Sequence, residues 1–198
     1  MWLEQIQRIA TLVQTRVQED KLFVIAVDGC GGAGKSTLCQ ALAQQVELWA
    51  PTQVIKLDDF YRPLSAQLQQ QLSRLEAQQA YFSTQTFLKQ MLMPLTQGLS
   101  ISYKPYAWLD GESEVEVRLH GRGLVIIDGV FSYSRCLRPW VDMSVFIDTP
   151  LQLRKQRLLA RPQPSTDWVP HWQQTEAWHH QHEDTVAAVD FVLDGAKA

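Results

Sequence analysis

Apolar residues along the chain form short continuous runs that are separated by longer stretches with helical spacing. The runs cover residues 22–27, 53–57, 124–127, 143–147 and 191–193. A run that is apolar at every position, rather than at every second one, predicts a strand buried on both faces. Such strands are typical of a parallel sheet covered by helices.

Between these runs, apolar residues recur every three or four positions, which predicts amphipathic helices. The first helix covers residues 2–17, where Leu3, Ile6, Ile9, Val13 and Val17 share one face. Further helices are expected at 36–46, 64–80, 84–95, 151–160 and 171–189. Alternation of strands and helices predicts an α/β doubly wound fold, and 198 residues without an obvious linker predict one domain over 1–198.

Residues 99–119 interrupt this alternation. Two short strand-like segments, Ile101–Tyr103 and Val115–Val117, flank a stretch that contains Pro, Asp and Gly. We therefore expect a β-hairpin inserted into the domain.

Composition and charge exclude several classes of protein. The net charge is −3, which gives no electrostatic case for nucleic-acid binding. No apolar run reaches the ~18–20 residues of a membrane span, and Glu4 stands where a signal peptide would carry cations. Cys30, Cys39 and Cys136 lack the spacing of a zinc site, so reduced thiols are expected. We therefore expect a cytoplasmic protein that contacts neither membrane nor nucleic acid.

The most specific motif fits the pattern G-x-x-x-x-G-K-[ST] of a phosphate-binding P-loop. It reads Gly29, Cys30, Gly31, Gly32, Ala33, Gly34, Lys35 and Ser36, and Thr37 follows. Glycines let successive backbone N–H groups point at phosphate oxygens, and the start of the next helix favours an anion. Lys35 would reach the β- and γ-phosphates of ATP, Ser36 would bind Mg²⁺, and Thr37 would lie near the α-phosphate.

The same glycines also spell the G-x-G-x-x-G of a dinucleotide site, for which an acid near residue 58 would bind a ribose. Lys35 and Ser36 would have no role in that site, whereas a magnesium–triphosphate complex needs both. A GTPase would need an Asn-Lys-x-Asp motif, and the chain contains no Asn. We therefore favour a P-loop protein that binds ATP.

Acidic residues follow two of the predicted strands. Asp58 and Asp59 come after the run at 53–57, and Asp128 ends the run at 124–127. The carboxyl ends of neighbouring parallel strands share one crevice, so these acids should face the γ-phosphate. Asp58 could then accept the proton of an attacking hydroxyl, and Asp128 could hold Mg²⁺. The alternative is that these residues only cap the segments that follow.

Three arginines lie on one face of the helix predicted at 151–160. Arg154, Arg157 and Arg161 are three and four residues apart, and Pro162 and Pro164 follow. Such a stripe could form a lid over about 154–168 and neutralise charge on the transferring phosphate. Solvated surface arginines are the alternative.

Taken in order, these motifs resemble the uridine kinase family, which includes nicotinamide riboside kinase and is related to phosphoribulokinase and pantothenate kinase. The motifs are the P-loop, Asp58-Asp-Phe-Tyr-Arg62, the Tyr-x-Pro-Tyr of the hairpin, Ile-Ile-Asp128-Gly and the arginine stripe. The similarity runs from about Phe23 to Gly195. It implies a nucleoside-kinase-like P-loop NTPase fold, with a five-stranded parallel sheet of order 2-3-1-4-5, and Mg·ATP as cofactor. It also implies that Asp58 is the catalytic base and that Asp128 replaces a strand-end Glu.

Two departures from this family concern the acceptor side. The family carries a ribose-binding Asp before the helix that starts near 84, whereas this chain has no acid in 80–84. In the hairpin, Tyr106-Ala107 replaces a Tyr-Asp pair. An altered acceptor is therefore expected. Tyr61, Arg62 and Tyr106 are the candidate acceptor-binding residues, with aromatic core packing as the alternative.

The sequence thus predicts a kinase that phosphorylates a hydroxyl of a small molecule, with a nucleoside as the leading acceptor. The alternatives are a sugar or vitamin precursor as acceptor, and a regulatory protein that binds ATP without turnover. Family members often form homo-oligomers, so an oligomer is among the expected forms. His179, His180 and His182 are interpreted as residues of a solvated helix rather than as a zinc site.

Overall fold

The protein is described by a computed structural model that covers residues 2–18, 20–62, 71–107, 111–112, 114–161 and 169–197. Its central sheet contains β1 (Leu22–Asp28), β2 (Thr52–Lys56), β7 (Gly123–Asp128), β8 (Met143–Asp148) and β9 (Phe191–Asp194). All neighbouring pairs are parallel, in the order β2-β7-β1-β8-β9. Numbered by their order within this sheet, the strands run 2-3-1-4-5, as the family resemblance implies.

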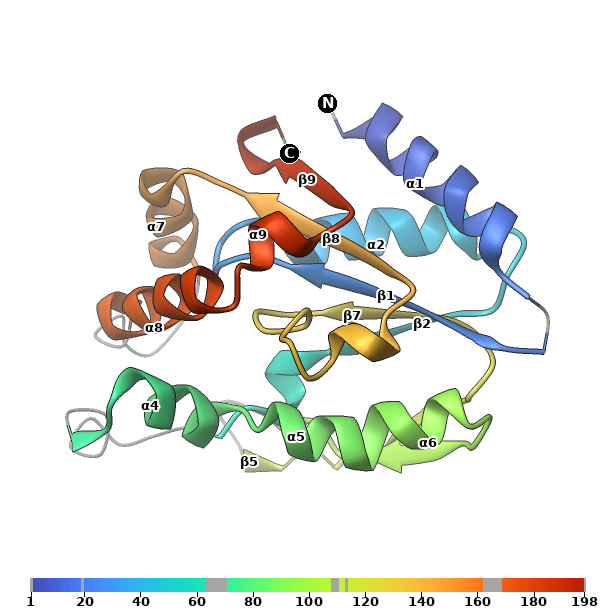
Figure 1. Cartoon of the computed structure of the whole chain (residues 1–198), viewed down its shortest axis with the longest axis horizontal. Coiled ribbons are helices and arrows are strands. Elements are labelled where there is room, and N and C mark those ends of the chain that lie inside the picture. The colour runs from blue at the N-terminus through green and yellow to red at the C-terminus, as the bar shows by residue number, and fades with distance from the viewer. Residues whose placement is uncertain are drawn as a thin grey trace.

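The helices lie on both faces of this sheet (Figure 1). Their bounds are α1 (Leu3–Arg16), α2 (Lys35–Val46), α4 (Arg74–Tyr81), α5 (Thr84–Phe87), α6 (Met93–Thr96), α7 (Leu151–Leu159), α8 (Val169–His182) and α9 (Thr185–Ala188). A π turn, η2 (Leu88–Leu92), joins α5 to α6, and 3₁₀ turns lie at η1 (Leu57–Phe60), η3 (Arg138–Trp140) and η4 (Gly195–Lys197). In the described residues, no helix combines the length and apolar character needed to cross a membrane.

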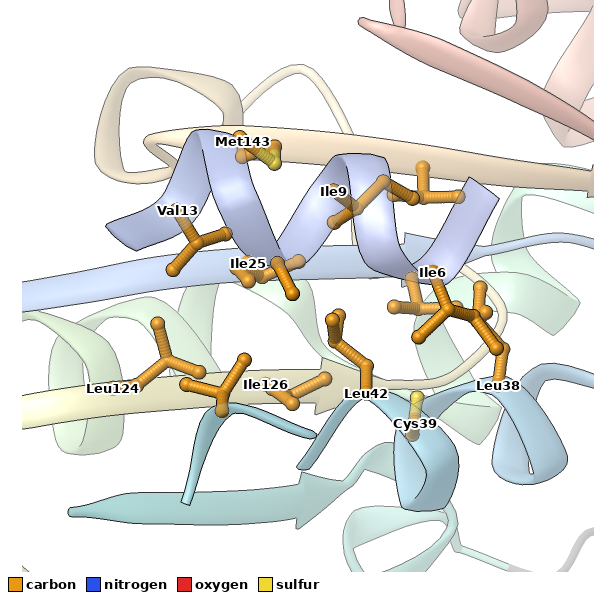
Figure 2. Packing of buried hydrophobic residues seen from close by; sticks show 14 of the residues in the cluster. Ile6, Ile9, Val13, Ile25, Leu38, Cys39, Leu42, Leu124, Ile126 and Met143 are labelled. Carbon is orange, nitrogen blue, oxygen red and sulfur yellow. The ribbon is translucent and has the colours of Figure 1, made fainter. Parts of the chain in front are cut away.

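One side of the sheet is covered by α1 and α2. Ile6, Ile9 and Val13 of α1 lie against Ile25 of β1 and Leu42 of α2 (Figure 2). These side chains are almost completely buried. The apolar residues of α1, which recur at helical spacing, thus form one face of the helix. This face packs on alternate residues of the strands.

The other side of the sheet is covered by α4, α5, η2 and α6. Val24 of β1 points to this side and joins a cluster that includes Phe87, Leu92 and Leu95. The inserted hairpin belongs to this layer. Its strands β3 (Ile101–Tyr103) and β6 (Val117–Leu119) pair antiparallel, as do β4 (Tyr106–Ala107) and β5 (Gly111–Glu112).

Two helices differ from the sequence predictions. In its described part, the helix expected at 64–80 is interrupted between Gln71 and Arg74, where Ser73 and Glu76 form the capping box that starts α4. The helix expected at 171–189 is broken at Asp184, whose φ of 50° lies in the left-handed region. A capping box and a left-handed residue both act on the backbone locally. The apolar spacing of a sequence predicts neither of them. Residues 63–70 and 162–168, which include part of the expected lid, lie outside the described residues.

Candidate functional site

The phosphate-binding motif connects β1 to α2, so its backbone lies at the carboxyl end of the central strand. Gly29, Gly32 and Gly34 have φ values of 140°, 77° and 107°. A Cβ on Gly32 would lie 2.6 Å from the carbonyl oxygen of Arg154. Glycine is therefore required at Gly32 both by its backbone angle and by the close approach of α7.

Asp28 fixes the start of this loop from inside the protein. Its buried carboxylate accepts hydrogen bonds from the backbone N–H groups of Gly29 (2.7 Å), Phe131 (3.2 Å) and Tyr133 (2.9 Å). Burial raises the pKa of Asp28, and the nearby His179 and these hydrogen bonds oppose that rise. Asp28 thus joins the phosphate loop to the segment after β7.

Lys35 and Ser36 lie in the first turn of α2, as the motif requires. The ammonium group of Lys35 donates to the carbonyl oxygens of Gly29 (2.8 Å) and Cys30 (3.1 Å). Ser36 and Thr37 are exposed at the start of the helix. Both hydroxyl groups are therefore accessible to a ligand that enters from solvent.

Three carboxylates lie at the carboxyl ends of β2 and β7, the two strands that they follow in the sequence. Asp58 and Asp59 belong to η1, and Asp128 is the last residue of β7. Asp58 is solvent-accessible, although protein surrounds much of its side chain. Partial loss of hydration of its carboxylate raises the pKa of Asp58; Lys35 and Arg161 oppose this rise, and Asp128 and Asp59 add to it. Asp58 follows β2, and Asp128 ends β7, the strand between β2 and β1, so both follow strands at the edge of the sheet where the phosphate loop begins.

The donors present fit a magnesium site that is completed by a nucleotide. A hydroxyl (Ser36) and a carboxylate (Asp128) are oxygen ligands of the kind that Mg²⁺ prefers. In the described ranges, no group of three or more His, Cys, Asp and Glu side chains is arranged to hold a metal by itself. A bound Mg²⁺ would take its remaining ligands from phosphate and water, as this ion commonly does.

Two arginines of the stripe, Arg154 and Arg157, donate hydrogen bonds to backbone carbonyl oxygens, whereas the third, Arg161, is exposed. Arg157 donates to the carbonyl oxygens of Ala33 (3.2 Å) and Gly195 (3.1 Å), so it ties the loop to the segment after β9. Arg154 donates through Nε to the carbonyl oxygen of Thr149 (3.0 Å). Arg161 is exposed at the end of α7 and interacts with Asp58.

The candidate acceptor residues have different surroundings. Tyr61 is buried in the core, and its hydroxyl donates to the carbonyl oxygen of Val130 at 3.2 Å. Arg62 is exposed, and Tyr106 is partly exposed in β4, which lies against η1. The position of Tyr61 favours its packing alternative, and a substrate role for Arg62 and Tyr106 stays a prediction.

The interpretation of α8 as a solvated helix is wrong for His179 and His180. Both are buried, with ring-centroid distances of 4.5 Å from His179 to Phe131 and 5.1 Å from His180 to Phe146. Sequence reasoning also missed Glu176, which is fully buried and bonds to the phosphate loop. The stripe Val169, Trp172, Glu176 and His179, at helical spacing, was the available signal.

Comparison with known proteins places the chain in a family. A model of the phosphoribulokinase / uridine kinase family matches residues 24–165. The chain therefore belongs to this family, and its fold is that of a P-loop kinase.

Individual relatives are distant. The chain is 27% identical over 141 residues to uridine-cytidine kinase B of Dictyostelium discoideum, a match that covers 70% of this chain and 58% of the relative. It is 22% identical over 140 residues to uridine kinase of Staphylococcus carnosus, covering 70% and 67%. The chain thus spans only part of the length of these curated relatives.

Solved structures show the same fold. A "possible uridine kinase" from Bacillus stearothermophilus superposes with a TM-score of 0.73 at 21% identity, covering 98% of this chain and 100% of the other. The D-glycerate 3-kinase of Cryptococcus neoformans gives a TM-score of 0.52 at 17% identity, covering 91% and 87%. At these identities the likeness concerns the fold alone.

Proposed function

We propose that this protein is an ATP-dependent kinase that transfers the γ-phosphate of Mg·ATP to a hydroxyl of a small molecule, with a nucleoside as the leading acceptor. The observation that carries the proposal is the position of Asp58. It is a solvent-accessible carboxylate, within electrostatic range of Lys35, on a segment contacted by the inserted hairpin. Membership of the phosphoribulokinase / uridine kinase family supports the same reaction class.

Each residue has a role in this proposal. The loop from Gly29 to Ser36 would hold the triphosphate through backbone N–H groups and Lys35, and Ser36 and Asp128 would hold Mg²⁺. Mg²⁺ would supply charge neutralisation on the phosphates when bound. Asp58 would accept the proton of the acceptor hydroxyl, and a raised pKa suits a group that must take up a proton.

Arg154 in α7 and Arg161 just after it would stabilise the transferring phosphate. Arg161 interacts with Asp58, and Arg154 follows the turn at Thr149, close to the glycines of the loop. Cationic groups near the γ-phosphate stabilise the charge that develops on its oxygens during transfer. Arg157 would act differently, by fixing the shape of the loop through its bonds to backbone carbonyls.

A second candidate is a kinase for a non-nucleoside acceptor, such as a sugar or a vitamin precursor. Residues 80–84 carry no carboxylate, and Tyr81 and Phe82 in this segment are buried. Ser83 caps α5 by accepting a hydrogen bond from the backbone N–H of Thr86. This segment therefore lacks the acid that would bind the two hydroxyls of a ribose.

The deciding experiment measures ADP release from Mg·ATP across a panel of nucleosides, nicotinamide riboside, pantothenate and simple sugars. We expect acceptor-dependent release that falls by at least ~100-fold in Asp58→Asn, in line with the loss of a general base. Asp59→Asn is the matched control, and it should keep most of the activity. Binding of Mg·ATP without turnover on any acceptor would favour a regulatory ATP-binding protein. Loss in Asp59→Asn alone would assign the base to Asp59.

A further inference from the structure

The carboxylate of Glu176, on α8, lies directly on the phosphate loop. Its Oε1 accepts a hydrogen bond from the backbone N–H of Gly31 at 2.7 Å. Its Oε2 lies 3.7 Å from Nη1 of Arg154. Glu176 has no exposed surface, so this carboxylate is held by the loop and α7 rather than by water.

Three groups that a triphosphate would contact are thus engaged within the protein. The N–H of Gly31 and the guanidinium of Arg154 face Glu176. The ammonium group of Lys35 is turned to the carbonyl oxygens of Gly29 and Cys30. Backbone N–H groups and arginine bind carboxylates and phosphates by the same charge-assisted hydrogen bonds. Glu176 therefore has the chemistry of an internal phosphate substitute.

The space beside Gly31 is closed by α8 and α7 together. A Cβ on Gly31 would lie 3.0 Å from Oε1 of Glu176, 3.6 Å from Nε1 of Trp172 and 3.7 Å from Cδ1 of Leu158. A phosphate oxygen cannot reach the Gly31 N–H while the carboxylate holds it. Either the side chain of Glu176 or α8 itself must move when a triphosphate binds.

We propose that Glu176 is an internal anion that occupies the phosphate loop in the nucleotide-free protein and competes with the phosphates of ATP. The proposal rests on the proposed function, because it requires a triphosphate to bind this loop. Displacement of Glu176 frees Arg154 to pair with a phosphate.

The displacement also reaches Trp172, on the same face of α8 as Glu176. Trp172 lies one turn before Glu176 and packs against Tyr61, with ring centroids 5.4 Å apart. Tyr61 follows the segment that carries Asp58. A shift of α8 on ATP binding therefore changes the packing next to the candidate base. This links nucleotide binding at the phosphate loop to activation of the acceptor by Asp58.

The test is the dissociation constant of Mg·ATP for the wild type, Glu176→Gln and Glu176→Ala, measured by calorimetry at pH 8. The carboxylate is ionised at that pH even though burial raises its pKa to about 7. We expect both variants to bind Mg·ATP about tenfold more tightly or better, since one charge-assisted hydrogen bond no longer has to be broken. Glu183→Gln is the matched control, because Glu183 bonds to the N–H of Arg135, outside the loop. It should leave the constant unchanged.

Hydrogen exchange of the wild type gives an independent test that needs no variant to fold. Addition of Mg·ATP should speed the exchange of backbone amides in α8 and slow it in residues 29–36. Slower exchange in α8, or equal or weaker binding by both Glu176 variants, would overturn the internal-anion proposal and leave the kinase proposal intact. Absence of Mg·ATP binding in the wild type and in every variant would instead overturn both.

Discussion

The phenol of Tyr103 donates a 3.0 Å hydrogen bond to Oδ2 of Asp59, which joins the inserted hairpin to the acidic segment after β2. The ring of Tyr103 also packs on Phe60, with centroids 4.7 Å apart. Asp59 is thereby held in place, while its neighbour Asp58 remains accessible to solvent. The hairpin therefore has a structural reason to influence the position of the candidate base.

Removal of this bond should affect the acceptor and not the nucleotide. In Tyr103→Phe, we expect a loss of about 1 kcal/mol in the free energy of unfolding, and an acceptor KM that rises several-fold. The dissociation constant of Mg·ATP should stay the same. Tyr133→Phe is the control, because its phenol donates at 3.3 Å to the carbonyl oxygen of Ala188. An equal rise of KM in both variants would contradict a specific role for Tyr103.

Replacement of two glycines with similar backbone angles distinguishes the effect of backbone strain from that of a steric clash with a neighbouring helix. Gly32 and Gly98 have φ values of 77° and 81°. A Cβ on Gly32 would lie 2.6 Å from the carbonyl oxygen of Arg154, whereas a Cβ on Gly98 would have no heavy atom within 4 Å. Gly98→Ala should therefore lose only about 1 kcal/mol of stability and keep Mg·ATP binding. Gly32→Ala should lose more stability and bind Mg·ATP at least ~100-fold more weakly.

Thermal unfolding and calorimetric titration of both variants check this pair. Normal Mg·ATP binding by Gly32→Ala would mean that α7 can move away from the loop without consequence. Loss of binding in Gly98→Ala would show that left-handed strain alone, outside the phosphate loop, disturbs the site.

The fold could be predicted because its signals are local and apolar. The run from Leu22 to Val27 is buried on both faces, as a parallel strand in the middle of a sheet must be. Glycines and Lys35 in the next residues specify a tight loop before a helix. These signals depend only on neighbours in the chain, so one sequence is sufficient to interpret them.

The burial of α8 could not be predicted by the same rules. Glu176, His179 and His180 are polar, and polar residues on a helix normally mark its solvated face. They are buried here because they contact groups that are distant in the sequence. Glu176 accepts a hydrogen bond from the N–H of Gly31, and His179 packs against the ring of Phe131. Nothing in the order of residues shows which distant groups will meet. The sequence therefore identified the phosphate loop and predicted the helix that covers it, but not the burial of the polar residues on that helix.

Acid should destabilise the protein through these histidines. Burial lowers the pKa of His179 to about 4 and that of His180 to about 3, from an ordinary value of 6.5. Their neutral forms favour the folded state fully above pH 6.5, and this contribution is lost as the pH falls toward those values. At pH 5 each residue would cost up to about 2 kcal/mol.

Replacement of His180 isolates this effect. His180→Phe keeps a ring next to Phe146 and removes the titrating group, so the midpoint of urea unfolding should fall less between pH 7 and pH 5. His182→Gln is the control, because His182 is exposed. Glu176 has the opposite effect on stability, because burial raises its pKa from 4.5 to about 7. Its protonated form stabilises the folded state fully below pH 4.5, and this contribution to the free energy of unfolding is lost as the pH rises through about 7. If the urea midpoint of His180→Phe fell between pH 7 and pH 5 by as much as that of the wild type, His180 would not resist protonation.

Arg157 lies in α7 and Arg161 lies just after the end of this helix, and we expect their replacement to have different effects. Arg157 bridges the carbonyl oxygens of Ala33 and Gly195, so Arg157→Gln should lower the free energy of unfolding by about 2 kcal/mol and weaken Mg·ATP binding about tenfold or more. Arg161 is exposed and interacts with Asp58, so Arg161→Gln should leave stability and Mg·ATP binding unchanged.

The loss in Arg161→Gln should appear in the chemical step instead. We expect its single-turnover rate to fall about 10- to 100-fold, because a cation near the transferring phosphate stabilises charge that exists only in the transition state. Lys155→Gln, an exposed cation in α7, is the control for a general change of charge. If Arg157→Gln lowered the rate and left stability and binding intact, Arg157 would leave its backbone partners in the nucleotide complex and contact the phosphate itself. The two arginines would then share one function rather than dividing it.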